Sequence, residues 1–256
     1  MCYEKIAPQK EPLAVTPKEE AVKQQGATVP IKDAGKGYRK EDGARLPEAF
    51  YIVIAGGEKR ERDYFTLLKQ QTIFQRLKLA FITDRTRLNP SGLLAVAREK
   101  KKYYATSQSE ENPDKIFLVS DVDDFYIELK EILPECITEK LSLIISNPCF
   151  EIWLYYGKCQ PPLQDFTIPS NPLKTSQALK RYLNEKVKGG INPKWAICDV
   201  ETATRNAENA YSEDKNGLPT LFSTNMFVLT EELLPLIQRG LDTLKEQRAH
   251  IASHHD

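Results

Sequence analysis

The chain has 256 residues, of which 41% are hydrophobic, so it can bury one large core or one core with a small appendage. Lys plus Arg and Asp plus Glu each number 36, and this zero formal charge excludes a global attraction to nucleic acid or anionic lipid. Without an apolar stretch near the roughly 20 residues of a bilayer span, or a secretion signal at Met1, we expect a cytoplasmic protein with no membrane contact. The five cysteines form no CxxC pair, which fits a reducing compartment.

The first part of the chain, residues 1–47, mixes Pro, Gly, Lys, Gln and Glu without a helical or strand period. Tyr3 and Tyr38 are its aromatic residues, so the segment has little apolar surface to bury. We therefore expect a disordered or partner-binding arm.

Residues 48–158 change to apolar runs separated by amphipathic stretches, a pattern typical of a mostly parallel sheet flanked by helices. We predict strands at 50–55 and 78–82, with a helix at 59–77 between them. A further helix, capped by Ser91, should end near residue 105. The sequence thus predicts an α/β fold.

The next apolar run, "KIFLVSDVDD", ends abruptly in acids, as a buried parallel strand does at its carboxyl edge. Asp121 and Asp123 are two residues apart on this strand, so both can present oxygens to one hard cation. With Asp124 they form a candidate metal site for Mg²⁺ or Mn²⁺. The alternative is that these acids solvate a turn and cap the following helix.

The stretch "SLIISNPCFEIWLYYG" predicts a fourth strand and then a helix that ends at Gly157. Asn147 is the expected N-cap of this helix, with Pro148 at its first position. Glu151 in the first turns can complement the helix dipole, or support a site together with Asn147.

Beyond a Pro-rich passage, residues 159–256 have the pattern of a mainly helical extension packed on the core. Helices are expected at about 175–188 and 200–212, followed by a long terminal helix with Pro235 in its early turns.

In chain order, "IAGGEKRERDYF", "FLVSDVDD" and "ISNPCFEIWL" resemble the three signatures of the RloB-like family of TOPRIM-related bacterial anti-phage defence proteins. The resemblance covers about residues 50–157 and weakens toward the closing "RNAENA" and "LPTLFST" segments. It implies a TOPRIM-like core, a divalent metal, phosphodiester chemistry in abortive infection, and an AAA-type or OLD-like ATPase partner.

Two positions depart from the family pattern, and the second is Arg60, which replaces a threonine and adds positive charge to the loop. Alignment of the first signature puts Gly56 where TOPRIM enzymes carry a strand-end glutamate, the general acid or base. Glu58 and Glu61 then have two interpretations: catalytic acids that replace the missing one, or ordinary acids at a helix N-terminus.

The same segment carries three cations, Lys59, Arg60 and Arg62. They can bind a phosphodiester and stabilise charge on its oxygens, with Lys59 in a catalytic role, or they can simply keep the surface soluble. The glycine pair lacks both GxxxxGK[ST] and GxGxxG, which excludes a Walker or Rossmann loop.

The leading hypothesis is a metal-dependent TOPRIM-like nuclease, or nuclease subunit, that acts on DNA or RNA, tRNA included. The competing hypothesis is a non-catalytic subunit that recognises nucleic acid or a partner protein and has lost its chemistry through Gly56. Cleavage assays with a divalent metal separate the two, because a binding subunit binds without cutting.

Overall fold

A computed structural model describes residues 50–57, 59–72, 77–82, 85–104, 113–159, 163, 166–171, 174–187 and 191–253. These residues belong to one compact unit. The arm predicted for residues 1–47 lies outside the described residues. Within the described ranges, no helix is both long enough and apolar enough to span a bilayer.

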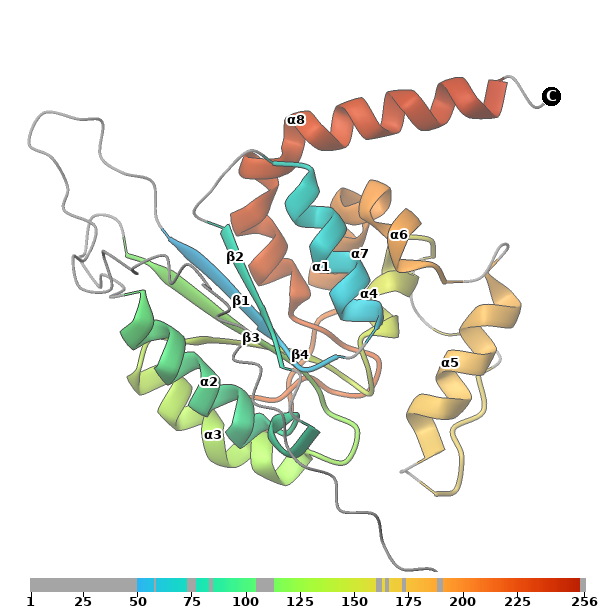
Figure 1. The fold of residues 1–256 in the computed structure, drawn as a ribbon. Coiled ribbons are helices and arrows are strands. Elements are labelled where there is room, and N and C mark those ends of the chain that lie inside the picture. The colour runs from blue at the N-terminus through green and yellow to red at the C-terminus, as the bar shows by residue number, and fades with distance from the viewer. Residues whose placement is uncertain are drawn as a thin grey trace, which may run out of the picture. The chain divides into compact units, whose positions relative to one another are not determined.

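The elements alternate between strands and helices up to β4 and are helical afterwards (Figure 1). In chain order they are β1 Tyr51–Ala55, α1 Arg60–Gln70, β2 Leu77–Phe81, η1 Arg85–Arg87, α2 Pro90–Tyr103, β3 Lys115–Asp121, α3 Tyr126–Thr138, β4 Ser142–Ser146, α4 Glu151–Tyr156, α5 Thr175–Lys186, α6 Pro193–Ala196, η3 Ile197–Asp199, α7 Val200–Ala210 and α8 Met226–Ser253.

The four strands form one sheet in the order β2-β1-β3-β4, and every pair in it is parallel. Parallel strands need a crossover between them, and helices α1, α2 and α3 supply these crossovers. The predicted α/β class with a mostly parallel sheet is confirmed.

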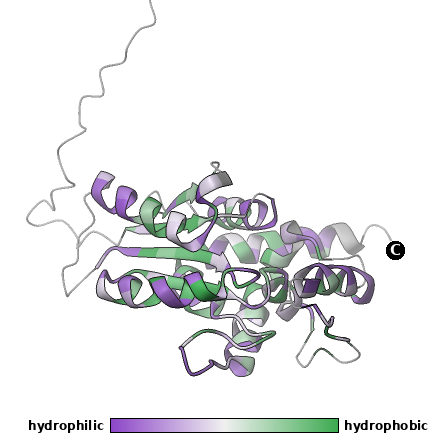
Figure 2. Cartoon of the chain, turned by 90° about the horizontal axis from the view of Figure 1, so that it is seen from below, coloured by the Kyte–Doolittle hydropathy of each residue, from purple (hydrophilic) through white to green (hydrophobic). Residues whose placement is uncertain are grey.

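Each face of the sheet is covered by a separate hydrophobic cluster (Figure 1). Alternate residues of β1 point to opposite faces, so Val53 packs with α1 and α8 while Ile52 and Ile54 pack with α2 and α3. Figure 2 shows the resulting layers, with hydrophobic strands between helices that carry both hydrophobic and hydrophilic residues. Burial on both faces explains why β1 and the middle of β3 are continuously apolar, whereas the edge strand β2 is only partly buried and contains Lys78.

The outer edge of β4 is covered by the segment that precedes α8. The Ile145 N–H donates to the Asn225 side-chain oxygen at 2.6 Å, and the Asn225 amide donates to the Leu143 carbonyl at 3.0 Å. Ser146 and Thr224 form an antiparallel bridge beside them. The C-terminal part of the chain therefore completes the hydrogen bonding of the sheet on this side.

Several predicted helix boundaries were wrong. Helix α1 ends at Gln70 instead of residue 77, and Asn89, not Ser91, caps α2 by accepting a hydrogen bond from the Gly92 N–H at 3.3 Å. Asn147 is not a helix cap either, because α4 begins at Glu151 after an N-cap at Phe150. Capping side chains cluster near helix starts in sequence, so the pattern alone does not choose between neighbours.

Candidate functional site

The loops that follow β1 and β3 lie side by side at the carboxyl edge of the sheet. Ala55 of β1 is paired with Val119 of β3, so Gly56 and Gly57 leave the sheet next to Asp121. Parallel sheets present ligand sites at this edge, where the strand ends leave room between diverging loops. The fold therefore brings the glycine pair and the acidic strand end together.

A cavity of about 290 Å³ opens between these loops. Three carboxylates line it, from Glu61 at the start of α1 and from Asp121 and Asp123 at the end of β3. One cation, Lys180 of α5, lines it as well. The cavity therefore combines hard oxygen ligands with a positive charge.

The acids of this cavity resist ionisation. Burial raises the pKa of Asp121 well above its usual range, and the charges of Glu61, Glu151 and Asp123 raise it further. Burial also raises the pKa of Glu61, although a hydrogen bond from its own backbone N–H opposes the shift. Carboxylates held this close in a partly dry site favour a proton or a cation that neutralises them.

The Glu61 carboxylate occupies the space that a side chain at position 57 would need. A Cβ built at Gly57 would overlap the carboxyl carbon and both oxygens of Glu61. Gly56 is less restricted, since a Cβ there would lie 3.2 Å from the Leu88 carbonyl oxygen and its backbone is outside the left-handed region. Gly57 thus lets the Glu61 side chain fold back over the loop.

Asp123 is held in place from the helical extension. Its backbone has a φ of 27°, which Asp adopts more readily than most residues, and its N–H donates to the Pro148 carbonyl at 3.0 Å. The Ser176 hydroxyl of α5 donates a hydrogen bond to one oxygen of the Asp123 carboxylate. The other carboxylate oxygen has no hydrogen-bond donor among the described residues.

Glu151 is buried beneath the cavity and forms ion pairs with two cations. Its carboxylate lies 3.1 Å from Arg60 and 3.7 Å from Lys180, and its side chain is 6% exposed. A buried charge is tolerated when it is paired, so Glu151 and Arg60 neutralise each other where α1 and α4 meet. Two cations on one carboxylate leave a net positive charge, and Lys180 presents this charge to the acids of the cavity.

The other candidate residues lie elsewhere. Lys59 and Asp124 are exposed and do not line the cavity. Arg62 lies over the ring of Phe81 at 5.1 Å, and the Asn147 amide donates to the Pro219 carbonyl at 2.7 Å. Glu58 is outside the described residues.

Sequence reasoning missed the contribution of α5. Lys180 and Ser176 come from the region interpreted as a helical extension, 53 residues from Asp123 in the case of Ser176. The buried Leu179 and Leu183 anchor this helix in the core, which turns its neighbouring polar residues toward the cavity. No local sequence pattern marks these two residues, because their position at the cavity depends on how α5 packs against the core.

The donor set fits a hard divalent cation. Among the described residues, no group of three or more His, Cys, Asp or Glu is arranged to hold a metal. Mg²⁺, however, is commonly held by one or two carboxylates and completes its shell with water and substrate phosphates. Asp121 and Asp123 are two such carboxylates that line the cavity. The prediction that both lie on the strand was wrong, because β3 ends at Asp121 and Asp123 follows in a turn with a φ of 27°.

Comparison with known protein families identifies the family of the chain. The model of the RloB-like protein family matches residues 51–233. The chain is an RloB-like protein. No curated protein and no solved structure matches it. The match extends beyond β4 through α7 into α8, so the helical extension is part of this RloB-like protein's family region.

Proposed function

We propose that this RloB-like protein is a metal-dependent phosphodiesterase that cleaves nucleic acid. The observation that carries the proposal is the cavity at the strand ends, where Glu61, Asp121 and Asp123 face Lys180. Carboxylates that hold a hard cation, beside a cation for the phosphate, are the components that phosphodiester cleavage needs.

In this proposal each residue has one task. Asp121 and Asp123 would hold Mg²⁺ or Mn²⁺, which when bound would neutralise phosphate charge and lower the pKa of a coordinated water. Lys180 would contact a non-bridging phosphate oxygen and stabilise the charge that builds there. Its orientation comes from Glu151, 3.7 Å away, and Arg60 keeps that carboxylate from being left as an unpaired buried charge.

Glu61 is the proposed proton acceptor. Its carboxylate lines the cavity, and burial raises its pKa toward the range in which a carboxylate exchanges protons efficiently near neutral pH. It would take over the role of the acid that is absent at Gly56. Glu58, the other acid of this segment, remains a candidate for the same role on sequence grounds alone.

The biological setting is a proposal that rests on family membership. A bacterial anti-phage defence system with an abortive-infection outcome, a cytoplasmic location and an AAA-type or OLD-like ATPase subunit are the expected context. Copurification of the chain with the product of a neighbouring ATPase gene, and plaque assays with and without that gene, test this setting. Protection that is unaffected by deletion of the ATPase would count against the partnership.

The activity test is cleavage of labelled tRNA, single-stranded RNA, single-stranded DNA and duplex DNA with Mg²⁺ or Mn²⁺. Asp121→Asn and Asp123→Asn should abolish cleavage, and Glu61→Gln should lower the rate about 100- to 10,000-fold. Asp124→Asn is the matched control, because Asp124 is exposed and does not line the cavity. Undiminished cleavage by the Asp121 and Asp123 variants would exclude the metal site and the mechanism together.

A second candidate function is recognition without cleavage, and the glycine at position 56 favours it. A Cβ at this position lies 3.2 Å from the Leu88 carbonyl oxygen, so Gly56→Glu requires a small shift of the Leu88 backbone but no forbidden backbone angle. If the natural protein binds without cutting and Gly56→Glu cuts, the chain is a binding subunit. If the natural protein cuts and Glu61→Gln does not, Glu61 carries the missing role.

A further inference from the structure

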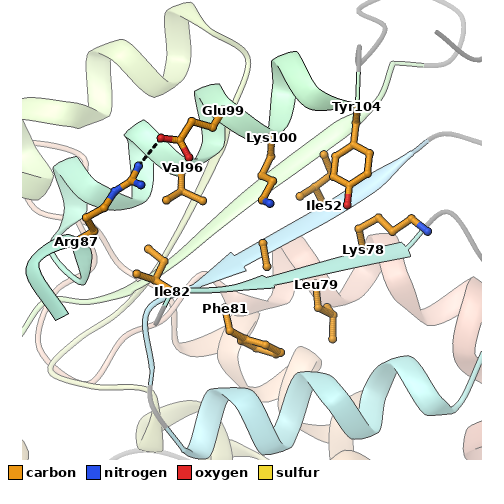
Figure 3. A pocket seen from close by; sticks show the side chains of 11 residues that line it. Ile52, Lys78, Leu79, Phe81, Ile82, Arg87, Val96, Glu99, Lys100 and Tyr104 are labelled. Atoms are coloured by element: carbon orange, nitrogen blue, oxygen red, sulfur yellow. Dashed lines mark hydrogen bonds and ion pairs between the residues drawn. The ribbon is translucent and has the colours of Figure 1, made fainter. Parts of the chain in front are cut away.

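A second cavity, of about 380 Å³, lies between β2 and α2, on the face of the sheet opposite α1 (Figure 3). The whole of β2 from Lys78 onward lines it, and Val96 of α2 and Tyr104, the C-cap of this helix, form the opposite wall. Strand β2 is the edge of the sheet, with β1 as its one strand neighbour among the described residues. The cavity is therefore a groove along an edge rather than an enclosed hole.

Cations outnumber acids in this groove. Lys78, Arg87 and Lys100 line it, while Glu99 is its one acid among the described lining residues and pairs with Arg87 at 2.8 Å (Figure 3). Lys78 and Lys100 have no carboxylate partner in the described part of the chain. A chain with zero net charge thus presents a local positive strip, which suits a ligand that carries regularly spaced negative charges.

Two tyrosines lie beside the strip: Tyr104 lines the groove, and its neighbour Tyr103 lies just outside the lining. Tyr103 is 75% exposed, and the ammonium of Lys100 lies 5.7 Å from the centre of its ring. Tyr104 packs against Phe50 with ring centres 4.9 Å apart and against the edge of Tyr103 at 4.8 Å. An exposed ring that is braced by its neighbours and flanked by lysine is a surface on which an unpaired base can stack.

The groove leads to the carboxylate cavity. Arg87 lines the groove, and the next residue, Leu88, lines the cavity that contains Asp121. An extended ligand that follows the groove from Lys78 toward Arg87 therefore arrives at the carboxyl edge of the sheet, where the acids lie.

We propose that the groove between β2 and α2 binds single-stranded nucleic acid, with phosphates along Lys78, Lys100 and Arg87 and a base on Tyr103. The groove leads to the carboxylate cavity. Only the statement that the bound strand reaches this cavity for cleavage rests on the proposed function. Binding of the strand does not require cleavage, so the two proposals fail separately. A peptide that pairs with the β2 edge is the competing occupant, but lysine on an edge strand opposes such pairing.

Binding is measured by fluorescence anisotropy of a labelled single-stranded DNA, and of the same sequence as RNA, about 20 nucleotides long. Omission of divalent metal, with EDTA present, prevents cleavage. Tyr103→Ala should weaken binding about ten-fold, whereas Tyr103→Phe, which keeps the ring, should bind as the natural protein does. The double variant Lys78→Ala/Lys100→Ala should lower the slope of log affinity against log salt by about 1.4, because each phosphate that the protein no longer neutralises reduces the slope by roughly 0.7.

Arg205→Ala is the control for loss of charge, because Arg205 is an exposed cation on α7, which packs on the opposite face of the sheet. It should change neither affinity nor salt slope. Photocrosslinking of a bromouracil-substituted strand, followed by mass spectrometry, should place the crosslink at Tyr103 or Tyr104. Unchanged binding by the Tyr103 and lysine variants, crosslinks on another face, or variants that alter self-association instead of oligonucleotide binding would each overturn the proposal.

Discussion

Replacement of Lys180 by methionine tests the electrostatic arrangement of the carboxylate cavity, because it removes the charge and keeps most of the side-chain volume. Lys180 lies 3.7 Å from Glu151, and two unit charges at that distance attract by about 4 kcal/mol at an effective dielectric of 20 and by about 1 kcal/mol in water. The Lys180 side chain is 38% exposed, so solvent screening brings the value toward the lower limit. Glu151 is 6% exposed and keeps Arg60 as partner, so we expect a loss of about 2 kcal/mol.

The pH dependence identifies the cause of this loss. Desolvation lowers the pKa of Lys180, but the charges of Glu151, Cys149, Asp121 and Asp123 outweigh it and raise that pKa above 10.5. The lysine therefore stabilises the fold below pH 10.5, as long as its carboxylate partners are ionised, and this contribution disappears as the pH rises through the folded-state pKa. Burial raises the pKa values of Asp121 and Asp123, so both take up protons as the pH falls, and the difference between natural and variant protein should also shrink at acid pH.

The assay is urea unfolding in EDTA at near-neutral pH and near pH 4. Arg181→Met, on the exposed side of the same helix, should stay within about 0.5 kcal/mol of the natural protein. If Lys180→Met is as stable as this control at neutral pH, α5 does not hold Lys180 against the acids and the charge argument is wrong.

Three further predictions concern the same cavity and one helix contact. Asp121→Asn should raise the free energy of unfolding in metal-free buffer at neutral pH, and the gain should vanish below pH 3.8, because a raised folded-state pKa means that ionisation of Asp121 destabilises the fold. Gly57→Ala should lower cleavage about 100-fold with the fold intact, because its Cβ displaces the Glu61 carboxylate. Gly240→Ala should destabilise the protein by about 1 to 2 kcal/mol, since its Cβ would overlap the Gln71 carbonyl.

Matched measurements check these three. For Asp121→Asn, urea unfolding across pH is decisive, and a variant less stable than the natural protein at neutral pH would contradict the reasoning. Gly56→Ala is the companion of Gly57→Ala and should keep more activity, because its Cβ meets one carbonyl oxygen at 3.2 Å. For Gly240→Ala, a rise in thermal midpoint, as expected from alanine in an unhindered helix, would show that α8 does not approach Gln71 closely.

The position of the strand-end acids could be predicted from the sequence, because the parallel fold limits where these acids can lie. Parallel strands joined by helices share one carboxyl edge, so the loop at Gly57 and the acid at Asp121 had to meet once β1 and β3 were neighbours. For Lys59, Arg60 and Arg62, the three cations at the start of α1, the sequence does not show which group each one contacts. Arg60 reaches Glu151 and Arg62 reaches Phe81, because helix residues two apart point in nearly opposite directions.

The part of the site that comes from α5 could not be predicted, because it depends on how a distant helix packs. In the sequence, Lys180 and Ser176 resemble ordinary surface residues of an amphipathic helix. Leu179 and Leu183 pack into the core formed by earlier elements, and this packing determines that Lys180 and Ser176 point toward the cavity. Tertiary packing of this kind leaves no local pattern in the sequence.

The segment that covers β4 has a consequence for synthesis on the ribosome. The partner of Ile145 on that edge, Asn225, follows it by 80 residues, so β4 is translated long before its outer hydrogen bonds can form. At elongation rates of about 5 to 20 residues per second, the interval is roughly 4 to 16 seconds. During this time the nascent sheet exposes an apolar strand with unpaired N–H and C=O groups, the kind of edge on which chains aggregate.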